Sequence, residues 1–111
     1  MELKFINSVT LQGIVGNAQV QEYAPGKMLC RFSLLTQREE KTSDGVPVVS
    51  PTWHYCVAQN IPGIPDLRFI TKGTVLYLEG AMRSVGYIQQ NGNIPCTRTE
   101  ISVGVLRILE Q

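Results

Sequence analysis

The chain has 111 residues, 43% hydrophobic and 17% charged, which suits one folded domain and leaves no room for a second. No apolar run approaches the roughly 18 residues of a membrane span, and the first residues lack the apolar core of a signal peptide. We therefore expect a cytoplasmic protein that makes no membrane contact. The formal charge of +1 excludes binding to nucleic acid through excess positive charge alone.

Alternating, β-forming segments dominate the first half of the chain, with no competing helical period. The first predicted strand covers Phe5 to Gly16, and a turn at Ala24 to Gly26 precedes a second strand over Met28 to Gln37. The polar stretch from Arg38 to Pro51 is expected to be a mobile hairpin connection. Thr52 to Gln59 is the third predicted strand.

The second half holds the only helix candidate, a short turn over Asp66 to Thr71, because prolines and a glycine before it prevent an earlier start. A fourth strand is predicted over Gly73 to Val85. Tyr87 to Pro95 is expected to be a hairpin that turns at Asn91-Gly92. The closing strand is predicted over Thr97 to Leu109.

Five strands with a helical segment between the third and the fourth follow the order of an OB-fold. We therefore predict an all-β chain in which residues 1–111 form a single OB-fold domain, a five-stranded, partly open barrel. OB-folds bind oligonucleotides, oligosaccharides or other proteins, so the fold alone does not choose a ligand.

Titratable side chains show no pattern of a catalytic or metal site. The cysteines Cys30, Cys56 and Cys96 are far apart and odd in number, which predicts buried thiols rather than a disulfide framework or a metal site. His54 is two residues from Cys56, but two ligands do not make a zinc site. We expect no enzymatic activity, no metal and no cofactor.

Period-2 geometry divides the third strand into two faces. The set expected inside the barrel is small: His54, Cys56 and Ala58. The set expected outside is Trp53, Tyr55, Val57 and Gln59. An outward tryptophan beside an outward tyrosine makes a platform on which bases stack, and stacking contributes about 1 to 3 kcal/mol per base.

Three phrases follow one another in fixed order along the chain. They are Asn7-x-Val9-x-Leu11-x-Gly13-x-x-Gly16, then Thr52-Trp53-His54, then Lys72-Gly73 leading into Tyr77-Leu78-Glu79-Gly80-x-Met82-Arg83. Together they resemble the bacterial single-stranded DNA-binding protein (SSB) family. The resemblance implies a homotetramer of OB-folds that binds single-stranded DNA without sequence preference during replication, recombination or repair.

The resemblance also implies which residues contact DNA. Trp53 and Tyr87 match stacking aromatics, Lys72 and Arg83 match basic residues on the DNA path, and His54 matches a residue of the subunit body. Weaker candidates lie on or near the second, third and fifth strands and the loop: Tyr55, Arg31, Arg38, Lys41 and Arg98. Interface packing is an equal alternative for Tyr55, a solvated surface charge is the alternative for each basic residue, and Tyr77 is expected to pack in the body.

Departures from the family pattern keep two alternatives open. Glu39 or Glu40 and Gln59 stand where many relatives carry stacking aromatics. The sequence ends at Gln111 without the linker and acidic tip of typical relatives, so tail-mediated recruitment of repair enzymes is not expected. The alternatives are a dimeric replication-restart factor similar to primosomal replication protein N, and an OB-fold interaction module without DNA binding.

Overall fold

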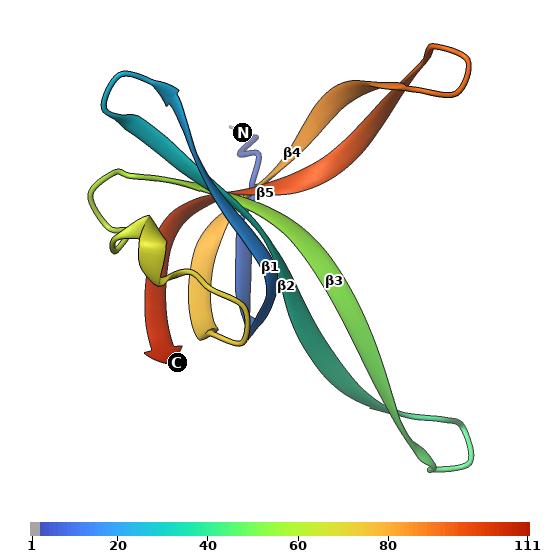
Figure 1. The fold of residues 1–111 in the computed structure, drawn as a ribbon. Helices are drawn as coiled ribbons and strands as arrows, with labels where there is room; N and C mark the ends of the chain where they lie inside the picture. The colour runs from blue at the N-terminus through green and yellow to red at the C-terminus, as the bar shows by residue number, and fades with distance from the viewer. Residues whose placement is uncertain (1–2) are drawn as a thin grey trace.

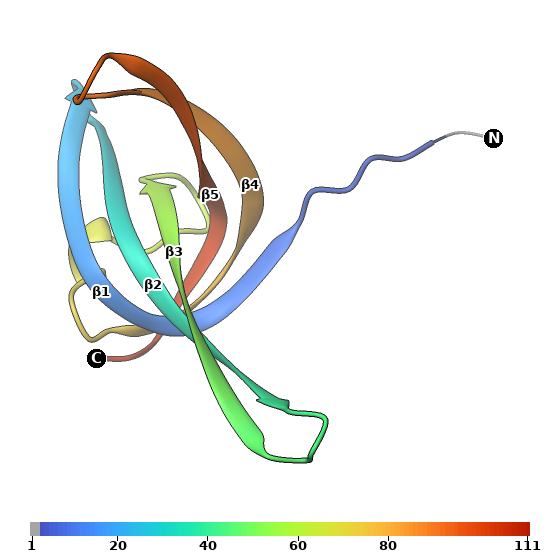
Figure 2. The same cartoon turned by 90° about the vertical axis from the view of Figure 1, so that its right-hand side faces the viewer.

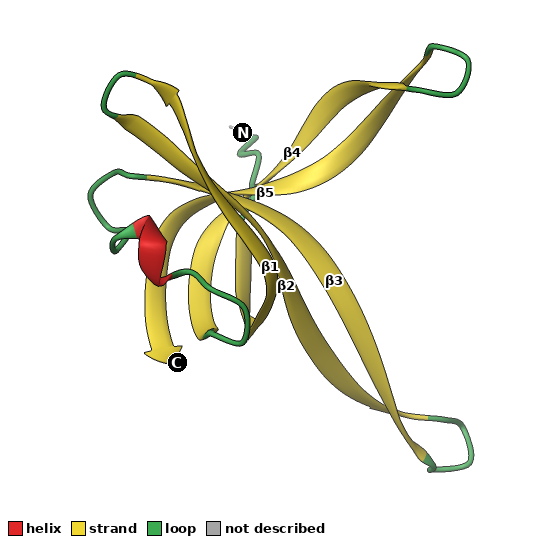
Figure 3. Ribbon diagram, viewed as in Figure 1, coloured by secondary structure: helices red, strands yellow, loops and turns green. Residues whose placement is uncertain are grey.

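Five long strands and one turn of 3-10 helix make up residues 3–111, the part of the chain that the computed structural model describes (Figures 1 and 3). Their bounds are β1 Val9–Ala24, β2 Lys27–Lys41, β3 Pro47–Gln59, η1 Leu67–Phe69, β4 Val75–Gln89 and β5 Ile94–Glu110. The strands close into a barrel in the order β1-β2-β3-β5-β4. This is the predicted all-β architecture, with its helical turn between β3 and β4. No helix within residues 3–111 is long and apolar enough to cross a membrane.

The ring closes over a short stretch. β3 and β5 are parallel and pair only at Cys56 with Ile101 and at Val57 with Ser102, whereas every other neighbouring pair is antiparallel. The barrel predicted to be partly open is therefore closed, but by a narrow contact. β1 and β5 each contain bulges, which bend a strand enough to let a small sheet curl on itself.

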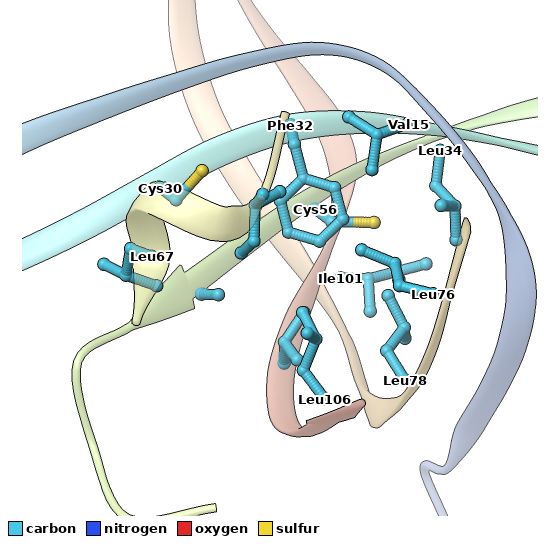
Figure 4. Packing of buried hydrophobic residues seen from close by; sticks show 13 residues of the cluster. Val15, Cys30, Phe32, Leu34, Cys56, Leu67, Leu76, Leu78, Ile101 and Leu106 are labelled. Atoms are coloured by element: carbon cyan, nitrogen blue, oxygen red, sulfur yellow. The ribbon is translucent and has the colours of Figure 1, made fainter. Parts of the chain in front are cut away.

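Apolar side chains from all five strands and from η1 fill the ring (Figure 4). Leu34, Leu76 and Leu78 are fully buried, and burying each contributes about 1.5–3 kcal/mol relative to exposure. Cys30 and Cys56 lie in this core as predicted, and burial raises the pKa of Cys56 to about 12. The same prediction is wrong for Cys96, which is only half-buried on β5.

β1 begins later than predicted and continues further. Phe5 to Gly16 was the expected range, but β1 covers Val9–Ala24, and Phe5 is 90% exposed ahead of it. Asn7 holds the segment before the strand, because its side-chain amide donates to the Met82 carbonyl at 2.8 Å and accepts from the Met82 N–H at 2.9 Å. A side chain therefore takes the place of a strand pairing at this point.

The predicted mobile connection from Arg38 to Pro51 is mostly strand. β2 and β3 pair without interruption as far as Lys41 with Pro47, so only residues 42–46 form the turn. Prolines fit here because this ribbon projects beyond the ring, where each strand has one free edge (Figures 1 and 2).

A second ribbon consists of β4 and β5. It was expected as a separate hairpin after a strand over Gly73 to Val85, but the pairing continues without a break to Gln89 with Ile94. Tyr87 therefore lies within a strand. The turn falls at Asn91-Gly92 as predicted, with Gly92 at a φ of 97° that favours glycine.

The helical turn is shorter than the predicted Asp66 to Thr71. η1 spans Leu67–Phe69, and Leu67 inserts into the core. Asp66 caps it by accepting hydrogen bonds from the Arg68 N–H at 3.0 Å and from the Arg68 guanidinium at 2.7 Å. These contacts hold the pKa of Asp66 to about 2.

Tyr77 is another correction. It was expected to pack inside the body, but it lies on the outer face of β4, between the buried Leu76 and Leu78. Its hydroxyl donates to the Glu79 carboxylate, which raises the pKa of Tyr77, and the Arg107 guanidinium lies 5.8 Å from its ring centroid. The alternation of β4 therefore puts the leucines inside and this polar group outside.

Candidate nucleic-acid interface

β3 divides its side chains as the period-2 pattern predicts. Trp53 and Tyr55 point outward and are 53% and 62% exposed, whereas Cys56 and Ala58 are buried. His54 is half-buried on the inner side, where its Nε2 lies 2.8 Å from the Thr36 hydroxyl. Burial lowers the pKa of His54. Two aromatic rings therefore stand on the outer surface of one strand, while the histidine between them belongs to the body.

Gly16 lets the Trp53 indole lie close against β1. A Cβ added at Gly16 would come within 2.5 Å of Cζ3 and 2.7 Å of Cη2 of the indole, closer than carbon atoms pack. It would also lie 2.9 Å from the Ser33 hydroxyl, which accepts a hydrogen bond from the Asn17 N–H. The absence of a side chain at Gly16 thus creates the seat of the tryptophan ring.

Lys72 lies close to this seat. The N–H of Gly73, the next residue, donates to the Val15 carbonyl at 2.8 Å, and Val15 directly precedes Gly16. The loop before β4 is thereby fixed to β1 beside the tryptophan. An exposed lysine and an exposed indole, 19 positions apart in the sequence, are brought to one region of the surface.

A groove of about 480 Å³ continues along the outer face from Tyr55. β1, β2, β3 and β5 all contribute to its walls, including Arg31, Ser33, Tyr55, Arg98 and Glu100. Ser33 pairs with Tyr55 across β2 and β3 and also borders the seat of Trp53. The tryptophan seat and the groove therefore form one continuous track.

Three arginines gather around Glu100, which lines the groove. The Arg83 guanidinium donates to Glu100 Oε1 at 2.6 Å, and nitrogen atoms of Arg31 and Arg98 lie 3.7 Å and 3.8 Å from Oε2. The Glu100 side chain is 3% exposed, whereas each arginine side chain is about half exposed. A buried carboxylate therefore lies beneath three solvent-facing cations.

Tyr87 extends the track onto the β4–β5 ribbon. Arg98, opposite Val85 on the neighbouring strand, places its guanidinium 5.9 Å from the Tyr87 ring centroid. Tyr87 itself is 44% exposed. A cation close to an aromatic ring stabilises the ring's position and still leaves an exposed ring for a stacking partner.

Of the nine predicted contact residues, seven lie along this track and two do not. Those on the track are Lys72, Trp53, Tyr55, Arg31, Arg98, Arg83 and Tyr87. Arg38 and Lys41 lie instead on the β2–β3 ribbon beyond the groove, where Arg38 pairs with Glu40 at 3.5 Å. The sequence did not reveal that Gly16 makes room for the Trp53 ring or that Glu100 contacts three arginines, because both roles depend on strand register.

The described residues gather no group of three or more His, Cys, Asp or Glu side chains that could hold a metal ion. The arrangement instead offers exposed aromatic rings, free guanidinium donors and a groove lined by four strands. Such a surface fits a flexible, anionic ligand with flat rings. Ring topology and groove together define an OB-fold protein with a candidate ligand surface on its outer face.

Comparison with known proteins agrees with this class and defines it further. The model of the Single-strand binding protein family matches residues 6–109, and the chain belongs to that family. A single-stranded DNA-binding protein from Bacteroides thetaiotaomicron is 34% identical over 108 residues, which are 94% of this chain and 66% of that protein. One from Xanthomonas axonopodis is 33% identical over 78% of this chain and 49% of its own length. The chain thus spans about half to two thirds of these relatives.

Solved structures share the fold. An SSB from Plasmodium falciparum, in complex with single-stranded DNA, has a TM-score of 0.75 and 21% identity over 99% of this chain and all of that chain. The single-stranded DNA-binding protein from Thermus aquaticus has a TM-score of 0.74 and 17% identity over 95% of this chain and 51% of that chain. The predicted OB-fold and the predicted family are both confirmed.

Proposed function

We propose that this chain binds single-stranded DNA without sequence preference and protects it in the cytoplasm during replication, recombination or repair. Bases stack on Trp53, Tyr55 and Tyr87, and phosphates contact the cations between them. No catalytic step is involved. Family membership supports this role, since relatives and a structural neighbour carry single-stranded DNA binding in their names.

The observation that carries the proposal is the continuity of the track. Exposed rings and exposed cations lie together along one face, which is the arrangement used by proteins that bind single strands through stacking and charge. Stacking does not depend on base identity, because every base has a π-face. The ligand is therefore defined by its chemistry as a strand with unpaired bases.

The net charge of +1 does not prevent phosphate binding, because basic residues are concentrated at the groove. Arg31, Arg83 and Arg98 converge at the groove with one glutamate among them, and Lys72 adds a charge on the loop that is hydrogen-bonded to β1 at Val15. A basic path thus exists on a nearly neutral molecule. If these four cations each contact a phosphate, the slope of log K against log salt is about −3, at about −0.7 per contact.

Fluorescence anisotropy of a labelled dT oligonucleotide, at low and high salt, tests the proposal. Binding that weakens with salt and is much weaker for a duplex of equal length supports it. A matched pair of variants locates the site, because Arg98 and Arg107 lie at nearly equal distances over Tyr87 and Tyr77. Arg98→Ala should lower the affinity and Arg107→Ala should not. Equal losses would place the DNA elsewhere, and no binding by the parent protein would favour the interaction-module alternative.

We propose a homotetramer as the working form, as the family resemblance implies. Light scattering of the purified protein measures the oligomeric mass directly. Four copies of the 12.3 kDa chain support this assembly, whereas two copies would favour the dimeric restart-factor alternative.

A further inference from the structure

The Glu100 cluster has a feature that DNA binding by stacking and charge does not explain. Its carboxylate is buried on the outer side of the sheet, beneath the arginines, rather than in the apolar core. Burying a carboxylate is costly unless charges and hydrogen bonds offset the loss of water. A carboxylate also reduces the positive charge of a surface that is meant to attract phosphates. Its presence at this point therefore needs a physical reason.

The three arginines come from strands that are not all neighbours. Arg31 is on β2, Arg83 on β4 and Arg98 on β5, and β3 lies between β2 and β5. Guanidinium groups repel one another when they converge, and each is carried on a long, flexible side chain. Backbone pairing cannot hold their ends together. Glu100 can, because its two oxygens lie within ion-pair distance of all three.

The distances divide the arginines into one anchor and two free groups. Arg83 is hydrogen-bonded to Oε1 at 2.6 Å. Arg31 and Arg98 lie at 3.7 Å and 3.8 Å from Oε2, near enough for attraction but beyond hydrogen-bond length. Their N–H donors are not used by the carboxylate. A phosphate oxygen in the groove can accept those donors without displacing Glu100.

We propose that Glu100 is a positioning residue for phosphate binding: it holds the guanidinium groups of Arg31 and Arg98 side by side at the groove, with Arg83 as its anchor. This inference rests on the proposed function. Arginines ordered in advance lose less side-chain freedom when a phosphate binds, so affinity is gained by preorganisation. Because Arg98 also lies over Tyr87, the same carboxylate supports the orientation of a stacking ring.

Glu100→Gln separates positioning from simple charge. The substitution makes the protein one unit more positive at the groove, so a purely electrostatic surface would bind dT oligonucleotide more tightly. Positioning predicts the opposite sign, a loss of about threefold or more in affinity. Glu110→Gln is the matched control, since it makes the same charge change on an exposed residue at the far end of β5.

A double-mutant cycle tests whether Glu100 acts through Arg98. Arg98→Met should cost less affinity in the Glu100→Gln background than in the parent protein, because the arginine has already lost its position. If Glu100→Gln does not fold, as judged by circular dichroism, Glu100→Asp replaces it in the cycle. That variant keeps the charge but withdraws the carboxylate by one methylene, and it is also expected to weaken binding.

The outcomes are distinct for the two proposals. A parent protein that does not bind dT oligonucleotide overturns the proposed function and this inference with it. A parent protein that binds, with Glu100→Gln equal or tighter, overturns the inference alone. Additive losses in the cycle would likewise overturn it. Weaker binding by Glu100→Gln, unchanged binding by Glu110→Gln and a non-additive cycle support it.

Discussion

Replacing Gly16 by alanine tests the seat of Trp53 without changing any side chain that would contact DNA. The new Cβ would lie 2.5 Å from the indole, whereas carbon atoms in contact lie about 3.5–4.0 Å apart. The ring must therefore withdraw by about 1 Å or more. It can do so at little cost, because Trp53 is 53% exposed and the clash is with the far end of its side chain.

We expect this substitution to change the free energy of unfolding little and to lower the affinity for DNA clearly. Gly→Ala substitutions gain about 0.4–1 kcal/mol through the unfolded chain, and weakening the Asn17–Ser33 hydrogen bond costs about 0.5–1.5 kcal/mol. The free energy of unfolding should thus change by less than about 1 kcal/mol. Stacking of one base on an aromatic ring contributes about 1 to 3 kcal/mol. Displacing the ring should therefore cost at least about 1 kcal/mol of binding free energy, which is about a fivefold loss of affinity.

Two assays decide the outcome: thermal unfolding, and titration with dT oligonucleotide followed by intrinsic fluorescence. Gly104→Ala is the control, because a Cβ there meets its nearest atom, the Glu79 carbonyl oxygen, at an ordinary 3.7 Å. Affinity of Gly16→Ala equal to that of the parent would show that the position of the indole against β1 is irrelevant to binding. A loss of several kcal/mol in stability would show that the contact belongs to the core.

Three further predictions follow from named contacts. Trp53→Ala should lower affinity with little change in salt slope, whereas Lys72→Ala should reduce the slope by about 0.7, and equal effects on slope would contradict this division. Gly80→Ala should lower the free energy of unfolding by more than about 2 kcal/mol, because its Cβ would overlap the Ser102 carbonyl on the neighbouring strand. Denaturant titration measures this loss, and an unchanged midpoint would contradict the packing. Burial lowers the pKa of His54 in the folded protein, so on acidification the unfolded chain takes up a proton first. The free energy of unfolding should therefore decrease as the pH falls below 6.5 and stop decreasing below the folded pKa. His54→Gln should remove this part of the pH dependence.

The sequence was sufficient for the order of elements and for the outer face of β3. Period 2 put Trp53 and Tyr55 outside and Cys56 and Ala58 inside, as observed, because alternation depends only on local geometry. The turn of the last hairpin was predicted at Asn91-Gly92 and lies there, because turn formation also depends on local geometry. Strand ends were less predictable, since the length of the β2–β3 ribbon depends on pairing between distant segments.

The centre of the candidate site was beyond sequence reasoning. Glu100 faces Arg83 only because a bulge at Gly104 of β5, opposite Glu79 and Gly80, shifts the register of β5 against β4. Arg31 joins them only after the ring has closed through β3. Tyr77 was misplaced because a tyrosine in an apolar strand has the same pattern whether it packs inward or lies against an arginine outside.

Quenching of the Trp53 fluorescence by dT oligonucleotide, at low and at high salt, tests the central claim most directly, because Trp53 is the only tryptophan and lies on the proposed track. We predict strong quenching whose midpoint moves to higher oligonucleotide concentration as salt is added. Saturable binding without any change in Trp53 emission would contradict the track, and the absence of binding would contradict the function.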